Sequence, residues 1–212
     1  MQNDSVGWDY ARQVVSGQLP ASRILIHACQ RALNDLESSQ DASSTYYYDA
    51  AAANHCIKFF GFLSHLKGPL AGRPLELADW QIFIVSQLYG WMRRSDNYRR
   101  YRTAYVEVPR KSGKSTFCSG LTLYALIGDS ENAAEVYAAA TTRDQARIVF
   151  GDAQAMVKKS PQLLEHLKCH RSATLHEASG SKFEPLSSDA GSLEGRSPSF
   201  SVVDELHVHR TS

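Results

Sequence analysis

The sequence predicts an α/β fold with a helical N-terminal extension, and three observations support this prediction. Apolar residues recur at helical spacing through much of residues 5–66. From about residue 103 onward, strand-like apolar runs alternate with helix-like segments, which is the pattern of an α/β domain. Two of these strand-like runs end in polar residues suited to phosphate and metal binding. We therefore expect a helical extension over residues 1–78 and an α/β core over residues 79–212.

The extension is predicted to contain amphipathic helices separated by a polar loop. Residues 38–45 are rich in Ser and Asp and predict the loop, and residues 46–66 predict a second helical segment. Gly and Pro residues between 68 and 74 predict turns that end this helical segment. Residues 78–92 then predict a further helix. The first helix is predicted from apolar residues at helical spacing, namely Ile24, Leu25, Ala28, Ala32, Leu33 and Leu36.

The core is predicted to alternate strands with helices, as in a sheet covered by helices. A polar loop at residues 191–199 precedes its last strand, which ends in adjacent carboxylates. The predicted elements before that loop are a strand at 103–108, a helix at 114–127, a strand at 134–140, a helix at 143–159, and short strands at 172–177 and 182–187.

The turn after the strand at 103–108 carries Gly-Lys-Ser, the core of a phosphate-binding loop. Gly113 lets the backbone approach a phosphate, Lys114 reaches the β- and γ-phosphates, and the Ser115 hydroxyl suits Mg²⁺. The full pattern has glycine where this chain has Val108, and an exposed basic turn is the alternative. The flanking strand and helix favour binding of ATP, through a loop formed by Arg110, Lys111, Ser112, Gly113, Lys114, Ser115 and Thr116.

The last predicted strand, residues 200–203, ends in Asp204 and Glu205. At the carboxyl end of a strand, Asp204 would bind Mg²⁺ and Glu205 would orient or deprotonate the attacking water. An acidic first turn of an ordinary helix is the alternative, and the upstream phosphate loop makes it the weaker one. Together the two segments predict a P-loop NTPase sandwich of the RecA/ASCE-like class, with ATP and Mg²⁺ as its ligands.

Composition sets limits on the class of protein. Hydrophobic residues make up 43% of the chain, enough for a core, and the formal net charge of +1 does not argue for nucleic-acid binding. No apolar run reaches eighteen residues, and the first residues lack the features of a signal peptide. The cysteines are irregularly spaced, which indicates reduced thiols in an intracellular protein: Cys29, Cys56, Cys118 and Cys169.

At this point the residues resemble a family, the N-terminal ATPase part of the large terminase subunit of tailed phages and prophages. The resemblance runs from about Tyr10 to His209. In this family the loop often has Pro-Arg where the first glycine is expected, so Val108 agrees with it. The matching segments are Val14–Gly17, Lys67–Gly72, Leu77–Gln81, Val108–Ser115, Ala139–Ala146 and Val203–His207.

The resemblance also implies roles for individual residues. Trp80 and Gln81 match an adenine-binding element, and a helix start with a packed tryptophan is the alternative. Arg110 matches an extra loop arginine that touches the γ-phosphate or couples hydrolysis to movement. Lys114 and Ser115 match the residues that bind phosphate and Mg²⁺, and the acidic pair matches the metal ligand and catalytic base.

The resemblance further implies an ATP-driven motor that packages double-stranded DNA into procapsids in the cytoplasm of the bacterial host. Its implied partners are the portal protein, the small terminase subunit and further copies of the chain in a ring, with no membrane. We expect an incomplete core, because strands beyond the acidic one, a coupling motif and a nuclease domain would follow in the family. We therefore expect slow ATP hydrolysis or none from this chain alone, and no DNA cleavage.

Three weaker signals have stronger alternatives. Arg196 could act as an arginine finger in a neighbouring subunit, as could Arg143 or Arg147. Residues 93–114 carry a local excess of Lys and Arg that could contact DNA phosphates, although a solvated loop explains it better. The last signal is a group of possible zinc ligands, although its spacing fits no standard zinc site and surface histidines with a buried thiol explain it better. The group consists of His166, Cys169, His170 and His176.

Two other functions compete with the packaging motor. A superfamily 2 helicase is one, because Asp204–His207 resembles a DExH box and Thr142-Arg143 resembles a nucleic-acid-binding helicase motif. The loop at Val108–Lys111 does not match the glycine-rich loop of helicases, however. The other is a docking module, which would bind nucleotide and a small terminase subunit without turnover.

Overall fold

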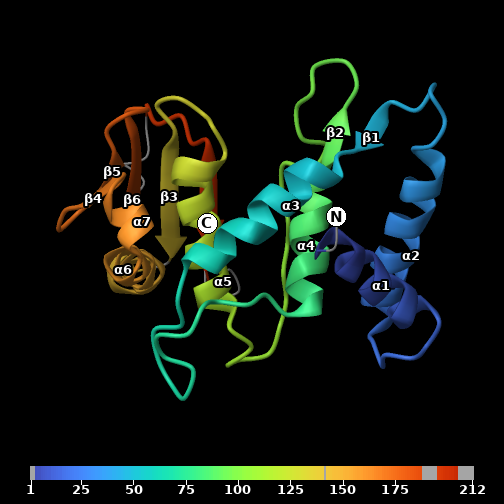
Figure 1. The fold of residues 1–212 in the computed structure, drawn as a ribbon, viewed down its shortest axis with the longest axis horizontal. Helices are drawn as coiled ribbons and strands as arrows, with labels where there is room; N and C mark the ends of the chain where they lie inside the picture. The colour runs from blue at the N-terminus through green and yellow to red at the C-terminus, as the bar shows by residue number, and fades with distance from the viewer. Residues whose placement is uncertain (1–2, 141, 188–194, 205–212) are drawn as a thin grey trace. The chain divides into compact units, whose positions relative to one another are not determined.

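The computed structural model describes residues 3–140, 142–187 and 195–204. By its contacts the chain forms two compact units. The first unit comprises Met1–Lys58 and Glu76–Glu107, and the second comprises Phe59–Leu75 and Val108–Ser212 (Figure 1). The helix that follows residue 78 groups with the N-terminal helices by its contacts. The domain boundary expected at residue 78 stays a prediction.

Helices dominate the first unit, and α1 packs against both α2 and α4 (Figure 1). Ser22 caps α2, because its hydroxyl accepts a hydrogen bond from the Leu25 amide. The last residue of α3 lies in the second unit. The elements are α1 (Asn3–Val15), α2 (Arg23–Ser38), β1 (Tyr46–Tyr48), α3 (Ala50–Phe59), α4 (Asp79–Gly90) and β2 (Trp91–Arg93).

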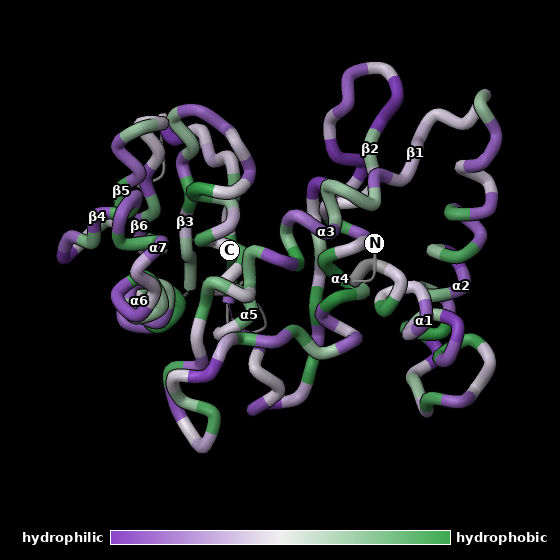
Figure 2. Tube along the Cα trace, viewed as in Figure 1, coloured by the Kyte–Doolittle hydropathy of each residue, from purple (hydrophilic) through white to green (hydrophobic). Residues whose placement is uncertain are grey.

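Aromatic rings fill the core of the first unit. The Trp8 ring lies edge-on to Tyr48 at 5.0 Å and to Trp91 at 6.5 Å between centroids. Gly90 allows this packing, since a Cβ there would lie 2.3 Å from the Tyr48 ring. Figure 2 shows hydrophobic residues along most of α4, which contributes Phe83 to the same core.

The prediction of a helix beginning at residue 46 was wrong in its first part. Tyr46–Tyr48 form β1, which pairs antiparallel with β2 in the register Tyr46↔Arg93. Aromatic residues favour strands when a partner strand is available, and β2 supplies it from 45 residues further along the chain. The helix of this segment, α3, begins only at Ala50.

The second unit is built on a mixed sheet with parallel strands at one side. In the described part of the chain its strand order is β4-β5-β6-β3-β7, with β3 parallel to β6 and β7, and β5 antiparallel to both its neighbours. The strands are β3 (Glu135–Ala140), β4 (Leu167–Cys169), β5 (Thr174–His176), β6 (Ser181–Ser187) and β7 (Phe200–Val203).

Helices lie against this sheet, with α6 on β3 and β6 and with α5 beside α6 and against β7 (Figure 1). They include α5 (Lys114–Leu123), a π-helical turn (Tyr124–Gly128), α6 (Arg143–Lys159), α7 (Pro161–Leu164) and a 3₁₀ turn (Phe60–Phe62). The predicted helices at 114–127 and 143–159 and the strands from 134 to 203 are therefore confirmed, while β4 was not predicted.

The strand predicted at 103–108 was wrong, because residues 101–109 adopt no regular secondary structure. The segment is largely solvent-exposed, with Tyr105 72% exposed. Its Tyr-Val-Glu-Val alternation favours a strand locally, but a strand also needs a neighbour to pair its backbone groups. In the described residues β3 pairs with β6 and β7 instead.

Residues 59–75 join the second unit through aromatic packing. The Phe60 ring, 1% exposed, stacks on Phe117 of α5 at 5.8 Å. Gly120 of α5 leaves room for it, since a Cβ there would lie 2.3 Å from the Phe60 ring. None of the described helices combines the length and the apolar composition that crossing a membrane requires.

Candidate nucleotide-binding site

The turn before α5 contains two residues in the left-handed region of backbone conformation. Lys111 and Gly113 both adopt positive φ, at 67° and 78°, and α5 begins at the next residue, Lys114. Glycine suits this position because positive φ strains other residues. Gly113 is the N-cap of α5 and provides no side-chain bond to the first turn. The helix N-terminus is thereby available to an anion.

Buried contacts hold the start of α5 in place. The Ser119 hydroxyl is fully buried and lies within hydrogen-bonding distance of the Ser115 carbonyl at 2.9 Å and the Val149 carbonyl at 3.0 Å. Because Val149 belongs to α6, this serine ties the helix behind the loop to the neighbouring helix. Ser119 was not identified in the sequence analysis. Its position as a polar residue within the apolar run after Ser115 could have indicated a buried hydrogen bond.

The acidic strand brings Asp204 to the loop. β7 runs parallel to β3, and the Asp204 amide donates to the Ala139 carbonyl at 3.0 Å. Asp204 therefore lies at the carboxyl ends of these strands, where ligand sites of parallel sheets are found. The Lys114 Nζ lies 3.3 Å from Asp204 Oδ1, and the Ser115 hydroxyl donates to Asp204 Oδ2 at 3.5 Å.

The site is partly enclosed. The Asp204 side chain is 12% exposed and that of Lys114 is 29% exposed. Burial, with a smaller contribution from the nearby Asp204 charge, raises the pKa of the Cys118 thiol to about 12, and Lys114 opposes the shift. Burial thus favours the protonated thiol form of Cys118.

The donor atoms at the site fit Mg²⁺. This ion is held by one or two carboxylates, water and substrate phosphates rather than by an all-protein cage. Ser115 Oγ and Asp204 Oδ2, 3.5 Å apart, are hard oxygen donors of the required kind. No group of three or more His, Cys, Asp or Glu side chains in the described ranges is placed to hold a metal.

The other predicted residues of the loop differ in their exposure to solvent. Arg110 and Lys111 are exposed in the turn, while Ser112 and Thr116 are partly buried on either side of Lys114. Glu205, the predicted base, lies outside the described residues.

Arg196 contacts Glu184 and Tyr137 through its side chain. It precedes β7, and its Nη1 lies 3.1 Å from Glu184 Oε2, with the guanidinium 5.0 Å from the centre of the Tyr137 ring. These contacts lie towards the amino ends of β3 and β7, whereas Asp204 follows the carboxyl end of β7.

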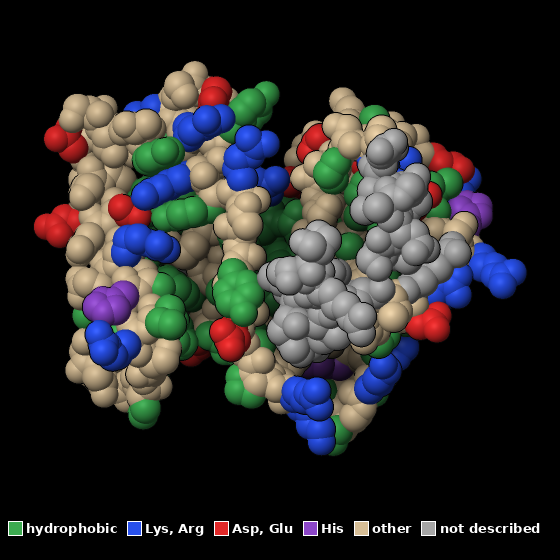
Figure 3. Space-filling model, turned by 180° about the vertical axis from the view of Figure 1, so that it is seen from behind, with side chains coloured by type: hydrophobic (Ala, Val, Ile, Leu, Met, Phe, Trp, Pro, Cys, Tyr) green, Lys and Arg blue, Asp and Glu red, His purple; other side chains and the backbone are tan. Residues whose placement is uncertain are grey.

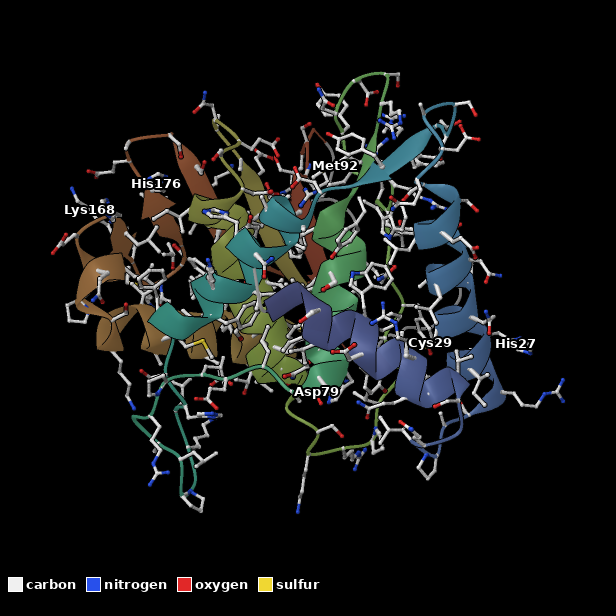
Figure 4. All side chains as sticks on the ribbon, turned by 45° about the vertical axis from the view of Figure 1, so that its right-hand side comes forward. His27, Cys29, Asp79, Met92, Lys168 and His176 are labelled. Carbon is white, nitrogen blue, oxygen red and sulfur yellow. The ribbon has the colours of Figure 1, made fainter. Side chains whose placement is uncertain are left out.

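Trp80 and Gln81 lie at the start of α4 in the first unit, next to Asp79 (Figure 4). Gln81 is 8% exposed, and its Oε1 accepts from the Ala78 amide at 2.9 Å. This amide oxygen therefore caps the helix, which is the alternative role considered for the pair. Adenine binding by Trp80 and Gln81 stays a prediction.

Arginines gather at the β1–β2 end of the first unit, and in Figure 3 Lys and Arg side chains alternate with hydrophobic ones on this unit. Several already have protein partners. Arg93 pairs with Asp96 at 2.8 Å, and Arg100 pairs with Asp35 at 2.9 Å while lying 4.5 Å from the Tyr46 ring centre. DNA contact by this segment stays a prediction.

The histidine and cysteine cluster is a feature of the β4–β5 hairpin, where Lys168 and His176 lie (Figure 4). The His166 and His176 rings are 6.5 Å apart, and His176 Nδ1 lies 2.7 Å from the Ser179 hydroxyl. Burial and the neighbouring His166 lower the pKa of His176. The hydrogen bond to Ser179 gives the His176 ring a structural role in the hairpin.

Comparison with known proteins gives concordant results. The family model "Terminase large subunit, ATPase domain" matches residues 79–212. A curated relative, "Terminase, large subunit" of Enterobacteria phage HK97, is 28% identical over 142 residues, covering 66% of this chain and 27% of the relative. These matches give no support to the helicase alternative.

The fold is also similar to a solved structure, the crystal structure of the HK97 bacteriophage large terminase. The TM-score is 0.60 at 23% identity, covering 71% of this chain and 30% of that one. The chain thus spans under a third of the length of either relative. Because the family model matches more than half of the chain, the protein belongs to the family of terminase large subunit ATPase domains.

Proposed function

We propose that this chain binds Mg²⁺-ATP at the turn before α5 and hydrolyses it as the motor part of a terminase that packages double-stranded DNA. One observation carries the proposal. Lys114 and Ser115 contact Asp204, a residue 89 positions beyond Ser115 in the sequence. A basic residue, a hydroxyl and a carboxylate meeting at a helix N-terminus provide the groups that a magnesium-bound triphosphate needs.

Each of these residues has a distinct proposed role. The first-turn amides of α5 and the Lys114 ammonium would bind the phosphates, with Lys114 exchanging its contact with Asp204 for phosphate oxygens. Ser115 and Asp204 would hold Mg²⁺, which neutralises developing charge on the β- and γ-phosphates. A RecA/ASCE-like P-loop sandwich is the specific fold that we propose for the second unit.

Four further residues complete the proposal. Glu205, adjacent to Asp204, would orient or deprotonate the attacking water. Arg110 would contact the γ-phosphate from the exposed turn. Arg196, which pairs with Glu184 within its own chain, would act on a neighbouring copy. Trp80 would help Gln81 to bind adenine.

The proposed partners belong to the assembled, longer protein. They are double-stranded DNA, the portal protein, the small terminase subunit and further copies of the chain in a ring, in the host cytoplasm.

Calorimetry with Mg²⁺-ATPγS tests nucleotide binding directly. We expect the chain to bind and Lys114→Ala to lose binding, because the substitution removes the phosphate-binding charge. Lys168→Ala is the matched control, since Lys168 pairs with Glu177 on the β4–β5 hairpin. Equal binding by all three proteins would refute the site. Binding with no hydrolysis in an assembled ring would instead indicate a docking module.

A further inference from the structure

The strand that carries Asp204 is short and its apolar pattern fixes its register weakly. β7 has four residues, and in the described part of the chain it pairs with β3 alone. Val202 and Val203 carry the same side chain. If β7 slipped by one residue along β3, one valine would take the place of the other in the pairing. Phe200 alone among its side chains is a large group that distinguishes the registers.

Polar contacts instead hold the segment before β7 against the start of β3. The Glu135 carbonyl accepts from the Ser199 amide at 2.9 Å, and the Glu135 amide donates to the Ser199 hydroxyl at 3.2 Å. The Ser199 hydroxyl donates in turn to Glu131 Oε1 at 2.7 Å. The Glu135 carboxylate accepts from the Ser197 amide at 3.1 Å. We refer to Glu131, Glu135, Ser197 and Ser199 as the Glu135 cluster.

The carboxylate of Glu135 is itself fixed from two other directions. The Tyr137 hydroxyl donates to its Oε2 at 2.8 Å, and Lys182 Nζ from β6 lies 3.1 Å from its Oε1. Its position therefore follows from β3 and β6, which pair over six residues from Glu135↔Lys182 to Ala140↔Ser187. The longer pair of strands can thus set the register of the shorter one.

The consequence reaches the far end of β7. A slip of one residue would move Asp204 by about 3.3 Å and turn its side chain to the other face of the sheet. The contacts of Asp204 with Lys114 and Ser115 are only 3.3 and 3.5 Å long. Either change would break both contacts.

We infer that Glu135 is a positioning residue for the magnesium site: by fixing the register of β7 against β3, its cluster places Asp204 beside Ser115 and Lys114. This inference rests on the proposed function for the metal and nucleotide. The register of β7 does not depend on whether the chain binds metal or nucleotide. An experiment can therefore test the role of Glu135 in the register separately from the proposed function.

The test compares the intact chain with Glu135→Gln, which keeps the shape of the side chain and removes its charge. ATPγS binding is measured with Mg²⁺ and with EDTA, and exchange of the Asp204 amide proton is followed by NMR. We expect Glu135→Gln to reduce the gain in affinity that Mg²⁺ confers, because Asp204 would lie beside Ser115 in fewer of the molecules. The affinity of Glu135→Gln in EDTA, which relies on Lys114, should stay within about twofold of that of the unmodified chain. Its Asp204 amide proton should exchange faster than in the unmodified chain.

Glu177→Gln is the matched control, because it removes an exposed carboxylate paired with Lys168. It should leave all three readouts unchanged. If Glu135→Gln does not fold, Ser199→Ala takes its place, since it removes the hydroxyl that bonds Glu131 and the Glu135 amide.

Two results would overturn the inference. One is an equal loss of binding with and without Mg²⁺, which would show a general structural role. The other is an unchanged exchange rate at Asp204. If the unmodified chain binds nucleotide under neither condition, the proposed function fails, and the exchange rate alone still decides the register.

Discussion

At the scale of the residue, the environment of Glu135 has a direct effect on its ionisation. The hydrogen bond from Tyr137 contributes most, followed by those from Lys182 and the Ser197 amide, and together they lower the pKa of Glu135 from 4.5 to about 2. All three favour the charged carboxylate. The folded protein thus binds a proton at this site more weakly than the unfolded chain does.

The stabilisation by Glu135 should depend on pH with a defined sign. Since the folded pKa is lowered, the stabilisation is complete above about pH 5 and is lost as the pH falls towards 2. Urea unfolding of the chain and of Glu135→Gln, between pH 7 and 2.5, measures it. We expect the two unfolding midpoints to differ by a constant amount above pH 5 and to converge below it. A difference independent of pH would contradict this assignment.

At the scale of the element, α5 depends on a close approach that its sequence alone does not reveal. Gly120 lies in the middle of the helix, where glycine is normally unfavourable by about 1 kcal/mol relative to alanine. The Phe60 ring occupies the space that a side chain would need. Helix propensity and packing therefore make opposite demands at this position.

Two matched substitutions separate these effects. Gly120→Ala should lower the free energy of unfolding by about 1–3 kcal/mol, because its Cβ would overlap the buried Phe60 ring. Gly151→Ala in α6 should raise it by about 0.5–1 kcal/mol, because nothing lies within 4 Å of a Cβ there. Urea denaturation measures both. Stabilisation by both substitutions would show that Phe60 does not restrict Gly120.

At the scale of the whole molecule, the separation of Arg196 from Lys114 within the fold bears on where hydrolysis takes place. Arg196 pairs with Glu184 near the amino ends of the strands, and Asp204 lies beyond the carboxyl end of β7. If Arg196 is the arginine finger proposed above, a complete hydrolytic site would require groups from two copies. ATP turnover by the chain should then rise more steeply than in proportion to its concentration.

A mixing experiment tests this requirement. Lys114→Ala lacks a phosphate site and retains Arg196, while Arg196→Ala has the reverse defect. In the assembled, longer protein we expect each variant to be inactive alone, by a factor of about 10³ or more for the arginine. We expect a mixture of the two to regain part of the hydrolysis rate. Failure of the mixture, with Arg196→Ala folded and binding ATPγS, would exclude Arg196 as a group acting between copies.

The sequence by itself determined the elements whose signals are local. Apolar spacing predicted the helix that forms α6 and the strand that forms β3, and the Gly-Lys-Ser triplet predicted the loop before α5. It did not determine strand pairing, because pairing depends on residues distant in the chain. Residues 103–108 have strand-like alternation and form no strand, whereas Tyr46–Tyr48 pair with β2.

Only the tertiary structure decided which polar groups meet. The sequence predicted that Lys114, Ser115 and Asp204 would share a site, and the pairing of β7 with β3 brings them within 3.5 Å. It contained no sign that Glu135 would bond Ser197 and Ser199, or that Arg196 would pair with Glu184. Those contacts join residues that approach each other only when the parallel strands are in register, since register is a property of the folded sheet.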